Sequence, residues 1–186
     1  MRLAPLATAA CAALAVAACS TTTPILETPT PPPVPMHDGV ANLASASGSL
    51  VSGRVQVMSM GSGVHIAGDV GGFEPGSAHG FHIHEKGDCS AADASSAGGH
   101  FNPLGAPHGR METTPHHAGD MDNIVADGEG VAHVNLHVEG VRLGGGGPID
   151  IAGRALVVHA KPDDYQSQPS GDSGARVACG IITIVD

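Results

Sequence analysis

The chain has 186 residues, enough for one domain with appendages, and its 18 acidic and 8 basic side chains give a formal net charge of −10. This acidic balance argues against a nucleic-acid partner, which would need a basic surface. The low aromatic content of 2% and the 27 glycines are typical of many tight turns around a small aliphatic core, and they argue against a helical protein.

Residues 1–19 have the features of an export signal. Arg2 supplies a positive start, an apolar run covers 6–18, and small residues lead to Cys19. The run is too short to cross a bilayer. The segment resembles a bacterial lipoprotein signal, which predicts lipidation of Cys19 as the only membrane attachment. Because Ser20 follows and not aspartate, we expect the outer membrane; the alternative is ordinary secretion with Cys19 discarded.

Residues 20–46 are rich in proline, threonine and serine, a composition typical of an extended spacer. The sequence therefore predicts a linker over 20–46 and a single folded domain over 47–186. His37 in the linker hints weakly at extra metal binding, but a solvated tail is the simpler interpretation.

Short runs with alternating apolar residues and intervening turns predict strands along the rest of the chain. The strand after the turn at 127–130 places His133 and His137 on the face opposite Val134 and Val138, which indicates that both histidines are solvent-facing. Eight or so strands favour an all-β antiparallel sandwich or flattened barrel with Greek-key connections. The predicted runs are 50–58, 64–70, 81–84, 124–126, 131–138, 148–151, 154–160 and 176–185.

Residues 80–120 contain six potential metal ligands and almost no large apolar side chains, so this segment cannot fold around its own core. His82 and His84 alternate with apolar residues in a predicted strand, so both imidazoles leave the same face. His159 ends a later predicted strand and is the best candidate to complete this incomplete site.

A second ligand set lies in a stretch of glycine, proline and alanine where only a loop is plausible. Such a long loop needs something to order it, and a metal ion is the best candidate. Three imidazoles and one carboxylate make a closed tetrahedral set that suits a structural zinc. These residues are His100, His108, His117 and Asp120.

These motifs together resemble copper/zinc superoxide dismutases of the bacterial periplasmic kind, over residues 47–186. No single motif is decisive, but six occur in the family's order and spacing. They are GFHIHE at 80–85, GGHFNP at 98–103, PHG at 107–109, HAGD at 117–120, LVVHAK at 156–161 and GARVACG at 174–180.

The resemblance implies an eight-stranded Greek-key β-barrel or sandwich with two long functional loops. It also implies disproportionation of superoxide to dioxygen and hydrogen peroxide in the periplasm, where the enzyme would protect the cell envelope. Members of the family occur as monomers and as homodimers. The implied copper ligands are His82, His84, His100 and His159, and the implied zinc ligands are His100, His108, His117 and Asp120, so that His100 bridges both ions.

The resemblance assigns two further residues. Asp163 matches the carboxylate that links a copper histidine to a zinc histidine, consistent with outer partners orienting ligands. Arg176 matches the arginine that holds the anionic substrate beside copper, and with His100 it completes the implied catalytic set. Lys86 and Lys161 also fall in the site motifs and are interpreted as steering charges, against the alternative of ordinary solvated lysines.

Four cysteines occur, of which Cys11 lies in the signal and Cys19 at its end. Cys89 and Cys179 are then the only pair in the folded domain. An exported domain would oxidise them to a disulfide.

Two other functions fit part of the ligand pattern. A zinc hydrolase would use an H-x-H motif, but Lys86 and Gly87 stand where such a motif continues with Asp-His. A hydrolytic zinc also keeps an open position, which the closed loop set does not leave. A non-catalytic metal buffer needs only the ligands, and Arg176 argues against it.

Overall fold

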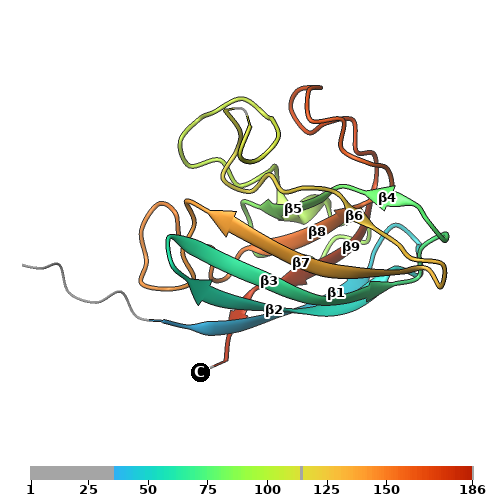
Figure 1. The fold of residues 1–186 in the computed structure, drawn as a ribbon, viewed down its shortest axis with the longest axis horizontal. Coiled ribbons are helices and arrows are strands. Elements are labelled where there is room, and N and C mark those ends of the chain that lie inside the picture. The colour runs from blue at the N-terminus through green and yellow to red at the C-terminus, as the bar shows by residue number, and fades with distance from the viewer. Residues whose placement is uncertain (1–35, 114, 186) are drawn as a thin grey trace, which may run out of the picture. The chain divides into compact units, whose positions relative to one another are not determined.

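The computed structural model describes residues 36–113 and 115–185, which fold as an all-β domain (Figure 1). The predicted signal and most of the predicted linker lie outside the described residues. No helix within 36–113 or 115–185 has the length and apolar character needed to cross a membrane. The elements are β1 (Asp38–Ser45), β2 (Ser52–Met60), β3 (Gly63–Gly71), β4 (Ala78–His79), β5 (Phe81–His84), the 3-10 helix η1 (Ser95–Ala97), β6 (Ile124–Val125), β7 (Val131–Glu139), β8 (Ala155–His159), β9 (Arg176–Ile181) and β10 (Thr183–Ile184).

An antiparallel eight-stranded sheet runs in the order β5-β8-β9-β1-β2-β3-β7, with β10 also paired to β1. Figure 1 shows this sheet curled over on itself. Among the strands of this sheet, β5 is the next along the chain after β3, and β8 is the next after β7, but neither pair is adjacent in the sheet. These two connections are the crossovers of a Greek-key topology. The all-β antiparallel prediction is confirmed.

Aliphatic side chains on the inner face of the sheet form the core. Val55 and Val57 of β2 and Val64 and Ile66 of β3 are fully buried. Phe81 and Ile83 of β5 join the same cluster. Because side chains alternate along a strand, this packing turns His82 and His84 toward the opposite face of β5.

The predicted start of the domain at residue 47 is wrong. Residues 38–45 form β1, which pairs with β2, β9 and β10 and lies in the middle of the sheet. Val40, Ala41 and Leu43 of β1 are buried. The preceding proline-rich run and the small residues of β1 gave this segment the composition of a linker.

Two other predicted strands differ in detail. Residues 124–126 do not form a hairpin with β7, because β6 pairs with β4 and only the single bridge from Ala126 to Ala132 joins the two arms. Residues 148–151 form no strand, since only Asp150 makes a bridge, to Arg142. The predicted hairpin of β2 and β3 is confirmed, with its first arm at 52–60 and not at 50–58.

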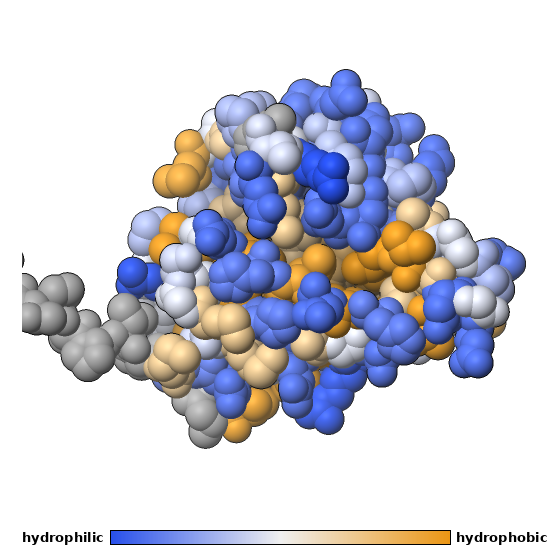
Figure 2. Space-filling view, in the orientation of Figure 1, coloured by the Kyte–Doolittle hydropathy of each residue, from blue (hydrophilic) through white to orange (hydrophobic). Residues whose placement is uncertain are grey.

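Two long connections lie above the sheet (Figure 1). Residues 85–123 join β5 to β6, and residues 160–175 join β8 to β9. We call residues 101–120 of the first the metal loop and residues 160–175 the closing loop. Figure 2 shows that this part of the visible surface is mainly hydrophilic. The connections are held by backbone and side-chain hydrogen bonds and by Phe101 and Met121, which are buried in the core.

Candidate metal centre

Paired strands position the first set of ligands. β5 and β8 are antiparallel neighbours, with His82 opposite Val157 and His84 opposite Ala155. The His159 amide N–H donates to the Gly80 carbonyl at 2.8 Å, which aligns the end of β8 with the start of β5. We call His82, His84, His100 and His159 the strand group; all four are buried and their ligand atoms lie within 4.8 Å of one another.

Within the strand group, the Nδ1 atoms of two histidines already make hydrogen bonds to the backbone. His84 Nδ1 donates to the Gly98 carbonyl at 3.0 Å, and His159 Nδ1 donates to the Gly174 carbonyl at 3.3 Å. These bonds leave a lone pair on each Nε2, and the two Nε2 atoms lie 3.3 Å apart. Nitrogens bound tetrahedrally to one ion at about 2.0–2.1 Å are separated by about this distance, so the pair fits a shared metal.

The second set comes from the metal loop. His108 Nδ1 lies 3.0 Å from Asp120 Oδ2, and His117 Nδ1 lies 3.2 Å from Asp120 Oδ1. His100 Nδ1 lies 2.7 Å from the same Oδ1. We call His100, His108, His117 and Asp120 the loop group; they too are buried with ligand atoms within 4.8 Å of one another.

Unpartnered nitrogens show that both groups suit metal ions. His82 Nδ1, His100 Nε2 and His108 Nδ1 are buried without a hydrogen-bond partner. His108 Nδ1 is near Asp120, but not in hydrogen-bonding geometry. Buried polar atoms are rarely left unsatisfied. Lone pairs that converge on one point meet this need when an ion binds there, so the residues fit the copper and zinc ions that the sequence predicts.

His100 is the only residue that belongs to both groups. Its Nδ1 is turned toward Asp120 of the loop group, and its Nε2 is the nitrogen left without a partner. Its ring centroid lies 4.1 Å from that of His82 and 5.1 Å from that of His84. The two nitrogens of one imidazole therefore serve the two groups.

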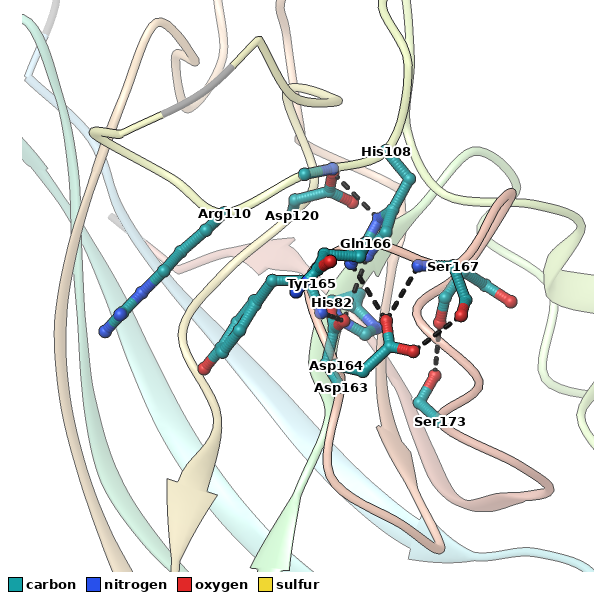
Figure 3. Close-up of polar contacts among 12 residues, drawn as sticks. His82, His108, Arg110, Asp120, Asp163, Asp164, Tyr165, Gln166, Ser167 and Ser173 are labelled. Carbon is teal, nitrogen blue, oxygen red and sulfur yellow. Dashed lines mark hydrogen bonds and ion pairs between the residues drawn. The ribbon is translucent and has the colours of Figure 1, made fainter.

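A carboxylate of the closing loop joins the two groups (Figure 3). Asp163 Oδ2 accepts from His82 Nε2 at 2.8 Å, and Asp163 Oδ1 accepts from His108 Nε2 at 3.0 Å. These bonds leave the Nδ1 atom of each histidine for a metal. Gly171 is required here, because a Cβ atom at this position would lie 1.7 Å from Asp163 Oδ1. The structure thus places Asp163 where the resemblance predicts it.

Two amide side chains that the sequence analysis missed hold the loops together. Asn123 grips the main chain of Asp163, accepting from its N–H at 2.8 Å and donating to its carbonyl at 2.9 Å. Gln168 grips the main chain of His108 in the same way, with both bonds at 2.9 Å. Each of the two connections, 85–123 and 160–175, therefore holds the main chain of a key residue in the other, and we call these four hydrogen bonds the amide clasps.

Two further supports also escaped the sequence analysis. The Gly98 carbonyl accepts from both His84 and Arg176, so it orients a ligand and a cation at once. Buried His79 donates from Nδ1 to the His159 carbonyl at 2.8 Å. The position of His79 directly before the GFHIHE motif could have indicated its role. No sequence pattern could have indicated the role of the Gly98 carbonyl, because its contacts depend on the tertiary structure.

Burial controls the protonation of the strand group. Desolvation lowers the pKa of His100 to about 4 and that of His159 to about 3. The pKa of His84 falls well below its usual value because of desolvation and the neighbouring His100 and His159. These three rings are therefore neutral near pH 7, which is the form that binds a metal.

In the loop group, neighbouring charged side chains affect the pKa values more than burial does. Burial alone would lower the pKa of His108, but Asp120 and Asp163 outweigh it and raise the pKa to about 9. Burial would likewise raise the pKa of Asp120, yet the facing imidazoles of His100, His108 and His117 hold it well below its usual range. A metal ion that binds here would displace the His108 proton.

An open pocket of about 360 Å³ leads to the strand group. Arg176 lines it and is held in place by donating to the Ala94 and Gly98 carbonyls. Lys161 adjoins Gly174 of the wall, but its Nζ lies 3.8 Å from Asp172. Lys86 does not line the pocket. The pKa of Asp88 is lowered mainly by hydrogen bonds from Ser90 and to a lesser extent by the charge of Lys86, so Lys86 lies near an acidic side chain. Arg176 is thus the cation that faces the site.

The predicted disulfide is confirmed. Cys89 and Cys179 are joined across 90 residues, with Cα atoms 5.8 Å apart. Cys179 belongs to β9, three residues after Arg176, and Cys89 belongs to the connection that carries Ala94 and Gly98. The bridge therefore fastens the segment that orients Arg176 to the sheet.

Residues 51–182 match the family described as copper/zinc superoxide dismutase. The second copper/zinc superoxide dismutase of Aquifex aeolicus (strain VF5) is 40% identical over 145 residues, 76% of this chain and 84% of that protein. A superoxide dismutase-like protein of Bacillus subtilis (strain 168), YojM, is 40% identical over 125 residues, 66% of this chain and 63% of that protein.

Solved structures give the same result. The crystal structure of the clock protein EA4 matches with a TM-score of 0.71 and 35% identity, covering 80% of this chain and 95% of that one. A superoxide dismutase-like protein from Bacillus subtilis matches with a TM-score of 0.69 and 36% identity, covering 76% of this chain and 96% of that one.

Proposed function

This chain belongs to the copper/zinc superoxide dismutase family, whose cofactors are copper and zinc, and we propose that it disproportionates superoxide at a histidine-bridged centre. Two superoxide ions and two protons give one dioxygen and one hydrogen peroxide. Because some relatives are named only dismutase-like, the observation that carries this proposal is the complete strand group beside Arg176 in an open pocket.

We assign copper to the strand group and zinc to the loop group. When bound, copper supplies one-electron redox chemistry, whereas zinc has no second oxidation state and supplies charge and structure. The four nitrogens of the strand group left for copper are His82 Nδ1, His84 Nε2, His100 Nε2 and His159 Nε2. Of these histidines, His84, His100 and His159 line the open pocket. Asp120 closes the loop group, so that group has no open position for a substrate.

The chain's own residues handle the anion and its protons. The Arg176 guanidinium holds a superoxide ion beside the strand group by charge and hydrogen bonding. His100 Nε2 carries a proton in one half of the cycle, while Nδ1 stays fixed on the loop-group side by its contact with Asp120. The second proton reaches peroxide from water in the open pocket. Lys86 and Lys161 add positive charge near the pocket, although each has an acidic neighbour.

The cellular setting is part of the proposal. A disulfide within the fold agrees with an oxidising compartment, and the signal-like residues 1–19 agree with export. We propose that the enzyme works in the periplasm, attached to the outer membrane through lipidated Cys19 and the linker, and removes superoxide before it damages the envelope. Mass spectrometry of the mature N-terminus tests the anchor: an acylated Cys19 supports it, and a first residue beyond Cys19 contradicts it.

Substitution of Arg176 separates a dismutase from a metal buffer. Arg176→Ile removes the cation without touching a ligand, so we expect normal copper and zinc content with superoxide decay slowed by at least tenfold. Arg54→Ile, on the exposed face of β2, is the matched control and should keep full activity. If Arg176→Ile retained full activity, the assigned role of Arg176 would be wrong; if the wild type bound both metals without accelerating decay, the buffer would be the better account.

A further inference from the structure

His137 on β7 shares an unusual property with the metal centre. Its Nδ1 is buried without a hydrogen-bond partner, and it lies on the outer face of a strand whose Val134 and Val138 face the core. Among the described residues, only three other buried side-chain atoms lack a partner, and all three are ring nitrogens of the strand and loop groups. In the metal centre, a buried ring nitrogen without a hydrogen-bond partner indicates a lone pair available to bind an ion. His137 has such a nitrogen as well.

A small cavity brings His137 together with other ligand types. The cavity measures about 110 Å³, and His137, His116, Glu139 and Met111 are among its lining residues. It lies between the metal loop and the end of β7, the last strand of the sheet.

His116 is already oriented to bind a metal. Its Nδ1 lies 2.7 Å from the His117 carbonyl oxygen, which can only accept, so Nδ1 carries the proton. The lone pair is then on Nε2, the free nitrogen of the ring. This is the arrangement of a metal-binding histidine whose other nitrogen is fixed by a backbone carbonyl.

The neighbouring strand offers a third imidazole. His65 of β3 stands directly opposite His137 in the sheet register, on the same outer face. Four residues along, Asp69 and His133 occupy the equivalent facing positions, and their side chains make a hydrogen bond of 2.7 Å. Side chains at facing positions of these two strands therefore reach each other, so His65 and His137 can share an ion.

We propose that His137, His116 and His65, together with Glu139, form a third metal site for a divalent ion of the zinc and copper(II) class. Imidazoles with one carboxylate suit these ions, and the net charge of −10 favours cation uptake. Within residues 36–113 and 115–185, only the strand and loop groups hold three ligand atoms already within 4.8 Å. The third site therefore closes by side-chain rotation, and it binds more weakly and exchanges faster than the centre.

Occupancy of this site has a consequence for the metal loop. His116 directly precedes His117 of the loop group, whereas His137 belongs to the sheet. An ion that joins them ties the metal loop to the edge of the sheet. Local opening of this loop then becomes rarer when the third site is filled.

Equilibrium dialysis against Zn²⁺ tests the proposal on protein whose centre is already filled with copper and zinc. We expect one additional zinc per wild-type chain. His137→Gln should weaken this additional binding by at least tenfold, whereas His133→Gln, a control on the same face of β7, should retain it. His65→Gln gives a second reading from the neighbouring strand and should also weaken it.

Two results would overturn the proposal. One is a wild-type chain that takes up no zinc beyond the centre; the other is a His137→Gln chain that binds the additional ion as well as His133→Gln does. Hydrogen exchange of residues 109–116 gives an independent readout, because zinc should slow it in the wild type and not in His137→Gln. Neither measurement depends on dismutase activity, so the proposal can fail while the proposed function stands.

Discussion

The two halves of the metal centre are built by different means. His82, His84 and His159 lie on β5 and β8, where backbone pairing fixes their positions. His108 and Asp120 lie in the metal loop, whose described residues form no strand of their own. Side-chain hydrogen bonds, above all those of Asp163 and the amide clasps, position the loop ligands instead. The strand group therefore depends on the core, and the loop group depends on polar contacts and on the metal itself.

The largest effect should come from a cavity in the core beneath the strand group. Ile83 is fully buried in β5 between the two ligand histidines. Ile83→Ala should lower the free energy of unfolding by about 2–5 kcal/mol, since it removes buried methyl groups and leaves a cavity. Urea denaturation of the metal-loaded protein measures this loss. Ile181→Ala, at a position that is 41% exposed, is the control; an equal loss in both would show that β5 does not rest on the core as described.

The next effect should come from the link between the groups. Asp163→Asn removes the charge that faces both His82 and His108, and we expect the affinities for copper and zinc each to fall by about 10–100-fold. Competition with a chelator measures both. Asp164→Asn is the control, because Asp164 is exposed and, among the described residues, its carboxylate accepts hydrogen bonds only from Gln166 and Ser167. A loss confined to one metal would contradict a link between the two groups.

A smaller effect should come from one amide clasp. Asn123→Ala removes both side-chain bonds to the Asp163 main chain. Each such bond contributes about 0.5–1.5 kcal/mol to stability. Because His82, His108 and Tyr165 still bond to the Asp163 carboxylate, only part of this loss reaches the loop group, and zinc affinity should fall by up to about tenfold, less than in Asp163→Asn. The same competition assay applies, with exposed Asn135→Ala of β7 as the control. Zinc affinity equal to that of the control would mean that the clasp does not position Asp163.

The smallest effect concerns the outer face of the sheet, away from the centre. The Asp69 carboxylate, with a lesser contribution from Asp127, raises the pKa of exposed His133. A raised folded pKa stabilises the fold fully below the unfolded value of about 6.5, and this contribution disappears as pH rises through the folded pKa. The wild type should therefore exceed His133→Gln in thermal stability at pH 5.5 by a small margin that vanishes at alkaline pH. A margin that grows with pH would reverse the sign of this argument.

The sequence predicted the strand half of the centre well, for a physical reason. Strand side chains alternate, so the spacing of His82 and His84 alone puts both imidazoles on one face. The prediction of the loop half relied on residue types and on the family resemblance. The roles of Asn123 and Gln168 could not be predicted, because they bind main-chain atoms of residues 40 and 60 positions away. Such contacts depend on how two loops pack, and no local pattern encodes this packing.

The error at β1 has a different origin. Its buried residues include a valine, an alanine and a leucine, in a run that also contains glycine, serine and asparagine. Small and polar residues after a proline-rich stretch are typical of a spacer. This run forms a strand because it pairs with β2 and with β9. β9 lies near the other end of the chain. Tertiary pairing therefore outweighed local composition here.

The decay rate of superoxide in the presence of the purified protein tests the central claim most directly. The protein should be compared after reconstitution with copper and zinc, with zinc alone, and after removal of copper by a chelator. The account predicts rapid decay only when the strand group holds copper, with dioxygen and hydrogen peroxide formed in equal amounts. Decay that is indifferent to copper would contradict it.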